Sequence, residues 1–141
     1  MKRITLTIIA LCICFVLKAQ YNNEIKVELL LKTDTTSIGQ KIIYPNFQSD
    51  EVTIAKVTIP PGKSTGWHKH TIPVFAYVLT GNLTVEIENK QTKQFPENTT
   101  FSEVINTFHN GINNGKIDVV LIAFYMGEKG KPLSIVRSDL K

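Results

Sequence analysis

The sequence predicts an all-β fold, either a barrel or a two-sheet sandwich, in a single domain. The apolar runs beyond residue 40 are short and rich in β-branched and aromatic residues. Turn residues separate these runs at regular intervals, and no helical periodicity of useful length interrupts them. The length of 141 residues corresponds to one domain, and 43% hydrophobic with 20% charged residues is typical of a globular protein.

The first nineteen residues differ from the rest and predict a secretory signal peptide. Lys2 and Arg3 form a basic head, residues 4–17 are almost entirely apolar, and Ala19 offers a small residue for cleavage. The alternative is a membrane anchor, although the apolar run is short for a span. We therefore expect export to the periplasm or the extracellular space, with no membrane contact after cleavage.

Removal of this segment would change both the cysteine content and the charge of the chain. Cys12 and Cys14 lie inside it, so the mature chain would have no thiolate ligand and no disulfide. Lys2, Arg3 and Lys18 belong to the sixteen basic residues, which leaves thirteen basic against twelve acidic residues. No basic stripe remains, and nucleic acid is therefore not an expected partner.

The elements beyond the signal are expected to be strands. Residues 20–40 form a lead-in, where Ile25–Leu29 alternates between apolar and polar residues and predicts a strand packed on the main body. Residues 41–141 then form the barrel domain. Turn residues end each of its expected strands, which are Lys41–Tyr44, Glu51–Ile59, Val74–Thr80, Asn82–Glu88, Thr92–Phe95, Thr99–Val104 and Ile117–Met126.

Three histidines follow the signal, and two of them are two positions apart. His68 and His70 lie in an extended stretch, where residues i and i+2 point to the same face. His109 lies in a second loop and strand segment. Imidazole ligands suit divalent transition metals, here iron, manganese, nickel, copper or zinc. A pair of this kind taken alone is equally well explained by an exposed strand.

The residues around the histidines resemble the two motifs of the cupin family. The first motif is a glycine, five residues, a histidine, one residue, a histidine, three or four residues, a glutamate, six residues and a glycine. The second motif ends with a histidine, three residues and an asparagine. The residues that fall at the matching spacings are Gly62, His68, His70, Gly81, His109 and Asn113.

This resemblance covers about residues 43–125 and is that of a small, single-domain, exported cupin. It implies a double-stranded β-helix, which is a jelly-roll-like barrel. It also implies a divalent transition metal held by His68, His70 and His109, with a small-molecule ligand or substrate as partner. A homodimer is a further expectation from the resemblance.

The sequence departs from the motifs at two places. Val74 stands where the first motif has its glutamate, the usual fourth metal ligand, and Val104 and Asn106 stand where a proline and a glycine are common. Glu103, six residues before His109, is the nearest replacement carboxylate. The alternative is an exposed or supporting glutamate that does not contact the metal. The motifs themselves therefore carry a ligand set of three histidines.

Four further residues are expected to line a pocket beside the metal. They are Val74, Tyr77, Phe108 and Asn113. The alternative for the aromatic residues is packing in the core. For Asn113 the alternative is to fix the loop that carries His109.

Three functions remain open at this point, because a fold does not determine a reaction. The first is a metal-dependent enzyme, a dioxygenase-like oxidoreductase, whose catalytic residues the sequence does not identify. The second is a binding protein that captures a small carboxylate, sugar or phenolic compound without turnover. The third is a structural barrel without metal.

Overall fold

The computed structural model describes residues 24–89 and 91–138, and the expected signal peptide at 1–19 lies outside this part. Within the described residues every regular element is a β-strand, which confirms the all-β prediction, and none is a helix that could cross a membrane. The strands are β1 (Asp50–Ile59), β2 (His68–Lys69), β3 (Val74–Thr80), β4 (Asn82–Ile87), β5 (Gln91–Pro96), β6 (Thr100–Ser102), β7 (His109–Ile112), β8 (Val119–Glu128) and β9 (Ile135–Val136).

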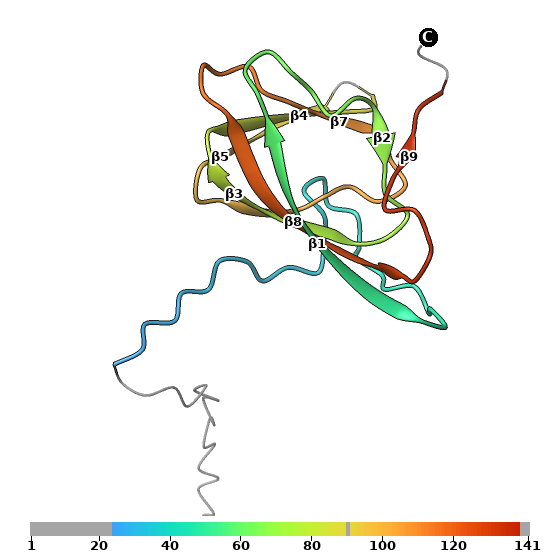
Figure 1. Cartoon of the computed structure of the whole chain (residues 1–141). Helices are drawn as coiled ribbons and strands as arrows, with labels where there is room; N and C mark the ends of the chain where they lie inside the picture. Colours follow the sequence, from blue (N-terminus) through green and yellow to red (C-terminus); the bar gives the residue numbers. More distant parts are fainter. Residues whose placement is uncertain (1–23, 90, 139–141) are drawn as a thin grey trace, which may run out of the picture.

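The strands form two antiparallel sheets that face each other (Figure 1). The first sheet has the order β1-β8-β3-β6 and the second has the order β5-β4-β7-β2-β9. The longest pair, β1 with β8, runs without a register shift from Asp50 opposite Glu128 to Ile59 opposite Val119. Neighbouring strands in each sheet are mostly distant in sequence, and this arrangement is the expected jelly roll.

The core lies between the two sheets, and strand alternation fills it. On β3 the side chains of Val74, Ala76 and Val78 are buried, because residues two apart point to the same face. Phe95 of the second sheet stacks on Phe101 of the first, with ring centroids 3.8 Å apart. This stack joins the two sheets beside β5 and β6.

The predicted strand at Ile25–Leu29 is wrong. In the structure this segment is extended but pairs with no strand of the described chain, and its side chains stay exposed, for example Val27 at 61%. Figure 1 shows it leading away from the sheets. Alternation gives a segment strand propensity, but a strand also needs a neighbour to accept its hydrogen bonds. Beyond this segment, the carbonyl oxygen of Leu30 accepts a 2.6 Å hydrogen bond from Thr100 Oγ1 of β6.

Other strand limits also differ from the prediction. Lys41–Tyr44 forms only one isolated bridge, between Lys41 and Thr35. The strand expected at Thr99–Val104 is shortened to β6, and β9 was not anticipated. The structure therefore leaves the loop that follows β6 free to carry a side chain toward the barrel interior.

Candidate metal centre

The three histidines come together because β2 and β7 are neighbours in the second sheet. His68 pairs directly with His109 across the two strands. His70 lies two residues after His68 and points to the same side of the sheet. The imidazole centroids are 4.5 to 5.1 Å apart, and His70 and His109 are almost fully buried. The three side chains therefore belong to one cluster that could hold a metal ion.

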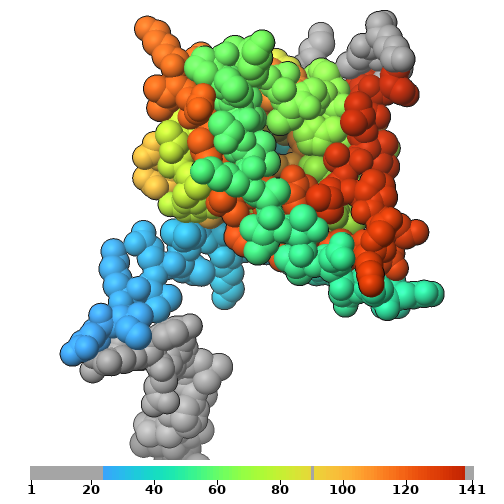
Figure 2. Space-filling view, viewed as in Figure 1, coloured from blue at the N-terminus to red at the C-terminus, as the bar shows by residue number. Residues whose placement is uncertain are grey.

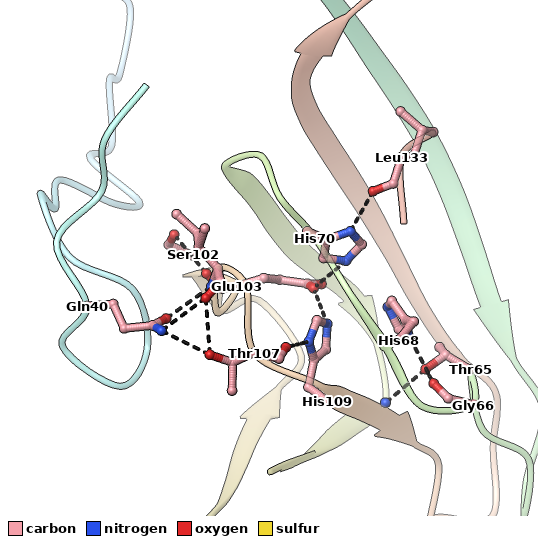
Figure 3. A network of polar contacts seen from close by, with 12 residues as sticks. Gln40, Thr65, Gly66, His68, His70, Ser102, Glu103, Thr107, His109 and Leu133 are labelled. Atoms are coloured by element: carbon pink, nitrogen blue, oxygen red, sulfur yellow. Dashed lines mark hydrogen bonds and ion pairs between the residues drawn. The ribbon is translucent and has the colours of Figure 1, made fainter. Parts of the chain in front are cut away.

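Main-chain carbonyl groups fix the orientation of all three rings (Figure 3). A carbonyl oxygen only accepts, so each Nδ1 must carry the proton, and Nε2 of the neutral ring then presents a lone pair. Such hydrogen bonds commonly orient metal-binding histidines. The donor and acceptor pairs are His68 Nδ1 to Gly66 O at 2.8 Å, His70 Nδ1 to Leu133 O at 2.7 Å and His109 Nδ1 to Thr107 O at 3.1 Å.

Glu103 supplies a carboxylate to the same point. Its Oε2 lies 2.8 Å from His109 Nε2 and 3.1 Å from His70 Nε2, and only 15% of its side chain is exposed. Its main-chain N–H donates a 2.9 Å hydrogen bond to the carbonyl oxygen of Val74. The carboxylate therefore belongs to a residue that is hydrogen-bonded to Val74. Val74 occupies the position at which the family motif has its glutamate. Of the two interpretations of Glu103, the structure favours the replacement carboxylate.

Asn106 explains one of the departures from the second motif. Its φ is +54°, in the left-handed region that glycine adopts freely and asparagine tolerates better than most residues. In this conformation its N–H donates a 2.7 Å hydrogen bond to the carbonyl oxygen of His70. Val104 is buried at 2% exposure and anchors the same loop in the core. The loop therefore keeps its shape without the usual glycine and proline.

Gln40 holds this loop from the other side (Figure 3). Its Nε2 donates 3.0 Å hydrogen bonds to the carbonyl oxygen of Ile105 and to Thr107 Oγ1. Its Oε1 accepts a 3.0 Å hydrogen bond from the N–H of Ile105. Because Glu103 and His109 lie at the two ends of this loop, Gln40 helps to set the distance between them.

The charges of the cluster depend on each other. In the absence of a metal, burial alone would raise the pKa of the Glu103 carboxyl, but the hydrogen-bond contacts with His109 and His70 outweigh it and hold that pKa well below its usual range. For His109, burial would lower the pKa, but the hydrogen bond to Glu103 raises it above the ordinary value. Burial lowers the pKa of His68. The carboxylate therefore stays ionised and attracts a cation to the two nitrogens beside it.

The donor set fits a transition-metal ion. One ligand atom from each of the four residues can be chosen so that all lie within 4.8 Å of one another. Imidazole nitrogen together with carboxylate oxygen suits divalent manganese, iron, nickel, copper and zinc. No cysteine belongs to the cluster, so nothing in it selects the softer, thiolate-bound ions.

A small cavity of about 50 Å³ lies against the four ligands. Its wall includes two further polar residues, Thr65 and Tyr125, and no pattern in the sequence indicated Thr65. The two-residue period of β8 places Tyr125 on the same face as the buried Leu121 and Ala123. Its ring centroid lies 5.6 Å from that of His70, and the pKa of its phenol is raised by burial and by the charge of Glu103.

The structure places none of the four expected pocket residues in the wall of this cavity. Val74 is completely buried in the core. Tyr77 lies on the outer face of β3, where its hydroxyl donates a 2.9 Å hydrogen bond to Asn98 Oδ1. The reason is parity, since Tyr77 is an odd number of residues from the inward-facing Val74.

Phe108 and Asn113 also lie outside the wall of the cavity. The Phe108 ring contacts two cations, with Lys69 Nζ 5.0 Å and Arg137 Cζ 5.1 Å from its centroid. Asn113 is fully buried, and its Nδ2 donates 2.7 Å hydrogen bonds to the carbonyl oxygens of Ile59 and Ile117. Asn113 therefore fixes the chain after β7 and does not line the cavity.

The fold and the cluster together define a small jelly-roll barrel with a candidate metal centre of three histidines and one carboxylate. The Cupin_2 family, described as cupin domain, matches residues 55–125, just over half of the chain. This chain belongs to the cupin family. The match includes the four residues of the cluster.

Known structures agree on the fold, while no curated protein is detectably similar in sequence. The DMSP lyase DddQ from Ruegeria pomeroyi is 13% identical, with a TM-score of 0.56 over 66% of this chain and 46% of the lyase. An oxalate oxidase solved with the substrate analogue glycolate is 20% identical, with a TM-score of 0.53 over 60% of this chain and 45% of the oxidase. A cupin-like protein from Thermotoga maritima is 17% identical, with a TM-score of 0.55 over 61% of this chain and 64% of that protein. This chain thus aligns with about half of the length of the two enzymes.

Proposed function

We propose that this chain is an exported cupin that holds a divalent transition metal on His68, His70, Glu103 and His109 and acts as a dioxygenase-like oxidoreductase. The observation that carries the proposal is the convergence of four donor atoms within 4.8 Å of one another. The proposal adds one carboxylate to the three histidines that the motifs provide. Export rests on the sequence of residues 1–19.

The orientation of the imidazole rings favours a bound metal ion. When Nδ1 of a neutral histidine donates to a carbonyl group, Nε2 can only accept. Two such lone pairs then face the oxygen of Glu103 at 2.8 and 3.1 Å, which is unfavourable without a positive charge between them. Two protons could provide that charge, but they would create two buried imidazolium groups beside each other. One divalent ion satisfies all four donors with the rings neutral.

The number and kind of ligands support the oxidoreductase assignment. A redox-active ion held by these four residues would supply electron transfer to a bound substrate. The side chains of this chain hold the ion, orient the imidazole groups and surround the cavity beside them with a largely apolar wall. The apolar wall keeps water away from this cavity.

A second function, binding of a small ligand without turnover, is favoured by one observation. Apart from the four ligands, Tyr125 is the only titratable residue among the described residues that line the cavity. The centre thus has few groups that could move protons during a reaction. In this alternative the same metal would capture a small molecule and release it unchanged.

Metal analysis tests the proposal. The chain from Gln20 onward should be purified without a metal-binding tag, and metal per chain should be measured by mass spectrometry. We expect near-stoichiometric metal in the parent and its loss in His68→Ala and Glu103→Ala. Lys69→Ala is the matched control, because Lys69 lies on the same strand but outside the cluster.

A parent protein that takes up no transition metal, even after reconstitution, would contradict the proposal. Once a metal is bound, oxygen consumption with product formation separates the two functions. Thermal stabilisation by a ligand without any product would favour the binding protein.

A further inference from the structure

The space beside the proposed metal is small. Its volume is about 50 Å³. A single water needs about 10 to 15 Å³ of such space, and a cavity of about 150 Å³ is known to accept benzene. There is room for about three to five non-hydrogen atoms on this scale, and the ion itself would fill part of it. A sugar or a phenolic ring is therefore too large to be enclosed beside the metal.

The wall of the cavity is mostly apolar. The aliphatic side chains that line it are Val57, Ile59, Leu83, Val85 and Leu121. They come from both sheets, on β1, β4 and β8, so the cavity lies between the layers. The space-filling view shows the surface hollowed between β1 with the loop after it and β2 (Figure 2). Those elements also supply Ile59, Thr65 and His68 to the wall.

Apart from the four residues of the cluster, Tyr125 has the only side-chain hydroxyl among the described wall residues that is free to donate to a ligand. The hydroxyl of Thr65 already accepts a 2.9 Å hydrogen bond from the N–H of Gly111 and donates to the carbonyl oxygen of Gly66 at 3.2 Å. The Tyr125 hydroxyl has no hydrogen-bond partner within the part of the chain that the structure describes. Its half-buried ring packs on the edge of His70, beside the metal ligands.

The charge of the site limits the ligand further. A divalent ion together with the Glu103 carboxylate and three neutral imidazoles carries a net charge of +1. No lysine or arginine is among the described residues that line the cavity. A singly charged anion would neutralise the site, whereas a dianion would leave an unpaired negative charge against an apolar wall, which is costly.

We propose that the open face of this centre takes a small monoanion of at most about four non-hydrogen atoms, such as a short monocarboxylate, with Tyr125 donating a hydrogen bond to it. This inference rests on the proposed metal centre and narrows its ligand. Of the carboxylates, sugars and phenolic compounds considered from the sequence, only the smallest carboxylates satisfy the volume, the wall and the charge.

Cobalt(II) is a suitable probe, because its visible absorption responds to a change of ligand. The reconstituted chain should be titrated with formate, acetate and azide, and in parallel with oxalate, benzoate and catechol. We expect the three small monoanions to shift the cobalt bands at concentrations at least tenfold lower than the other three require. Tyr125→Phe should weaken formate binding about three- to tenfold, the loss of one hydrogen bond, without loss of cobalt. Leu83→Ala enlarges the cavity and should admit benzoate.

The outcomes separate this inference from the proposal on which it rests. A parent protein that takes up no cobalt contradicts the metal centre and the inference together. A parent that holds cobalt and binds benzoate or oxalate as tightly as formate overturns the inference alone. Unchanged formate affinity in a folded, cobalt-loaded Tyr125→Phe overturns the role of that hydroxyl.

Discussion

Replacement of Glu103 by glutamine tests the electrostatics of the centre without metal, because it keeps the side-chain shape and removes the charge. Glu103 Oε2 lies 2.8 Å from His109 Nε2, and the side chain is 15% exposed. A hydrogen bond to a charged group contributes about 1.5 to 3 kcal/mol. For a domain of this size, 1 kcal/mol corresponds to roughly 3 to 5 °C in Tm. Glu103→Gln should therefore lower the Tm of the metal-free protein by roughly 5 to 15 °C where His109 is protonated.

The effect should depend on pH in a definite direction. The pKa of His109 is raised above 6.5 in the folded protein, so its contribution is complete below pH 6.5 and is lost as the pH rises through the raised value. The pKa of Glu103 is lowered from 4.5, so its contribution is complete above pH 4.5 and is lost as the pH falls through the lowered value. The difference between parent and variant is therefore largest between pH 4.5 and 6.5.

Thermal unfolding followed by circular dichroism, with a chelator present, measures this difference at pH 5.5 and pH 9. Burial lowers the pKa of His68 and destabilises both proteins as the pH falls below 6.5, so His68 largely cancels in the comparison. Glu97→Gln is the control, because Glu97 is an exposed carboxylate in a turn. Equal stability of Glu103→Gln and parent at pH 5.5, or an equal deficit at both pH values, would refute the reasoning.

Three other perturbations should have distinct effects. Metal at one hundred times its Kd should stabilise the parent against thermal unfolding by about 2.7 kcal/mol. An equal rise in the Tm of His68→Ala on adding metal would contradict the site. Gln40→Ala removes three hydrogen bonds to the loop between Glu103 and His109. It should weaken metal binding about ten- to one hundredfold in a chelator competition. An unchanged Kd for the metal would show that the loop keeps its conformation without Gln40. Phe101→Ala should cost about 3 to 5 kcal/mol in urea unfolding, and a loss below 1 kcal/mol would mean that the stack on the second sheet contributes little.

The long strands were predictable because their signals are local. Alternation and turn residues gave β3 at its observed limits and β1 within one residue. By contrast, β9 has two residues and exists only because it pairs with β2. The segment at Ile25–Leu29 shows the opposite case, since its alternation is clear but the described chain offers it no partner.

The spacing of the histidines in the sequence was enough to identify them as candidate ligands. The sequence did not decide whether the Glu103 carboxylate joins them. Glu103 reaches the site because the chain after β6 lies next to Val74 of β3, and this neighbourhood follows from strand pairing across many residues. Tyr77 was misplaced for a similar reason, since its face is fixed by the register of β3. The single-sequence pattern identifies which residues can bind a metal, but pairing between distant strands decides which of them meet.

The ring orientations at the centre have a consequence for how the protein tolerates substitution. Each Nδ1 proton is received by a main-chain oxygen, at Gly66, Thr107 and Leu133. A main-chain oxygen is present whatever side chain occupies the position, so an ordinary substitution at Thr107 or Leu133 cannot delete the acceptor. The histidine orientations are thus protected from point mutation and depend on the path of the backbone. A shortened C-terminal segment that loses the Leu133 carbonyl would release His70 while every residue of the cluster remained in place.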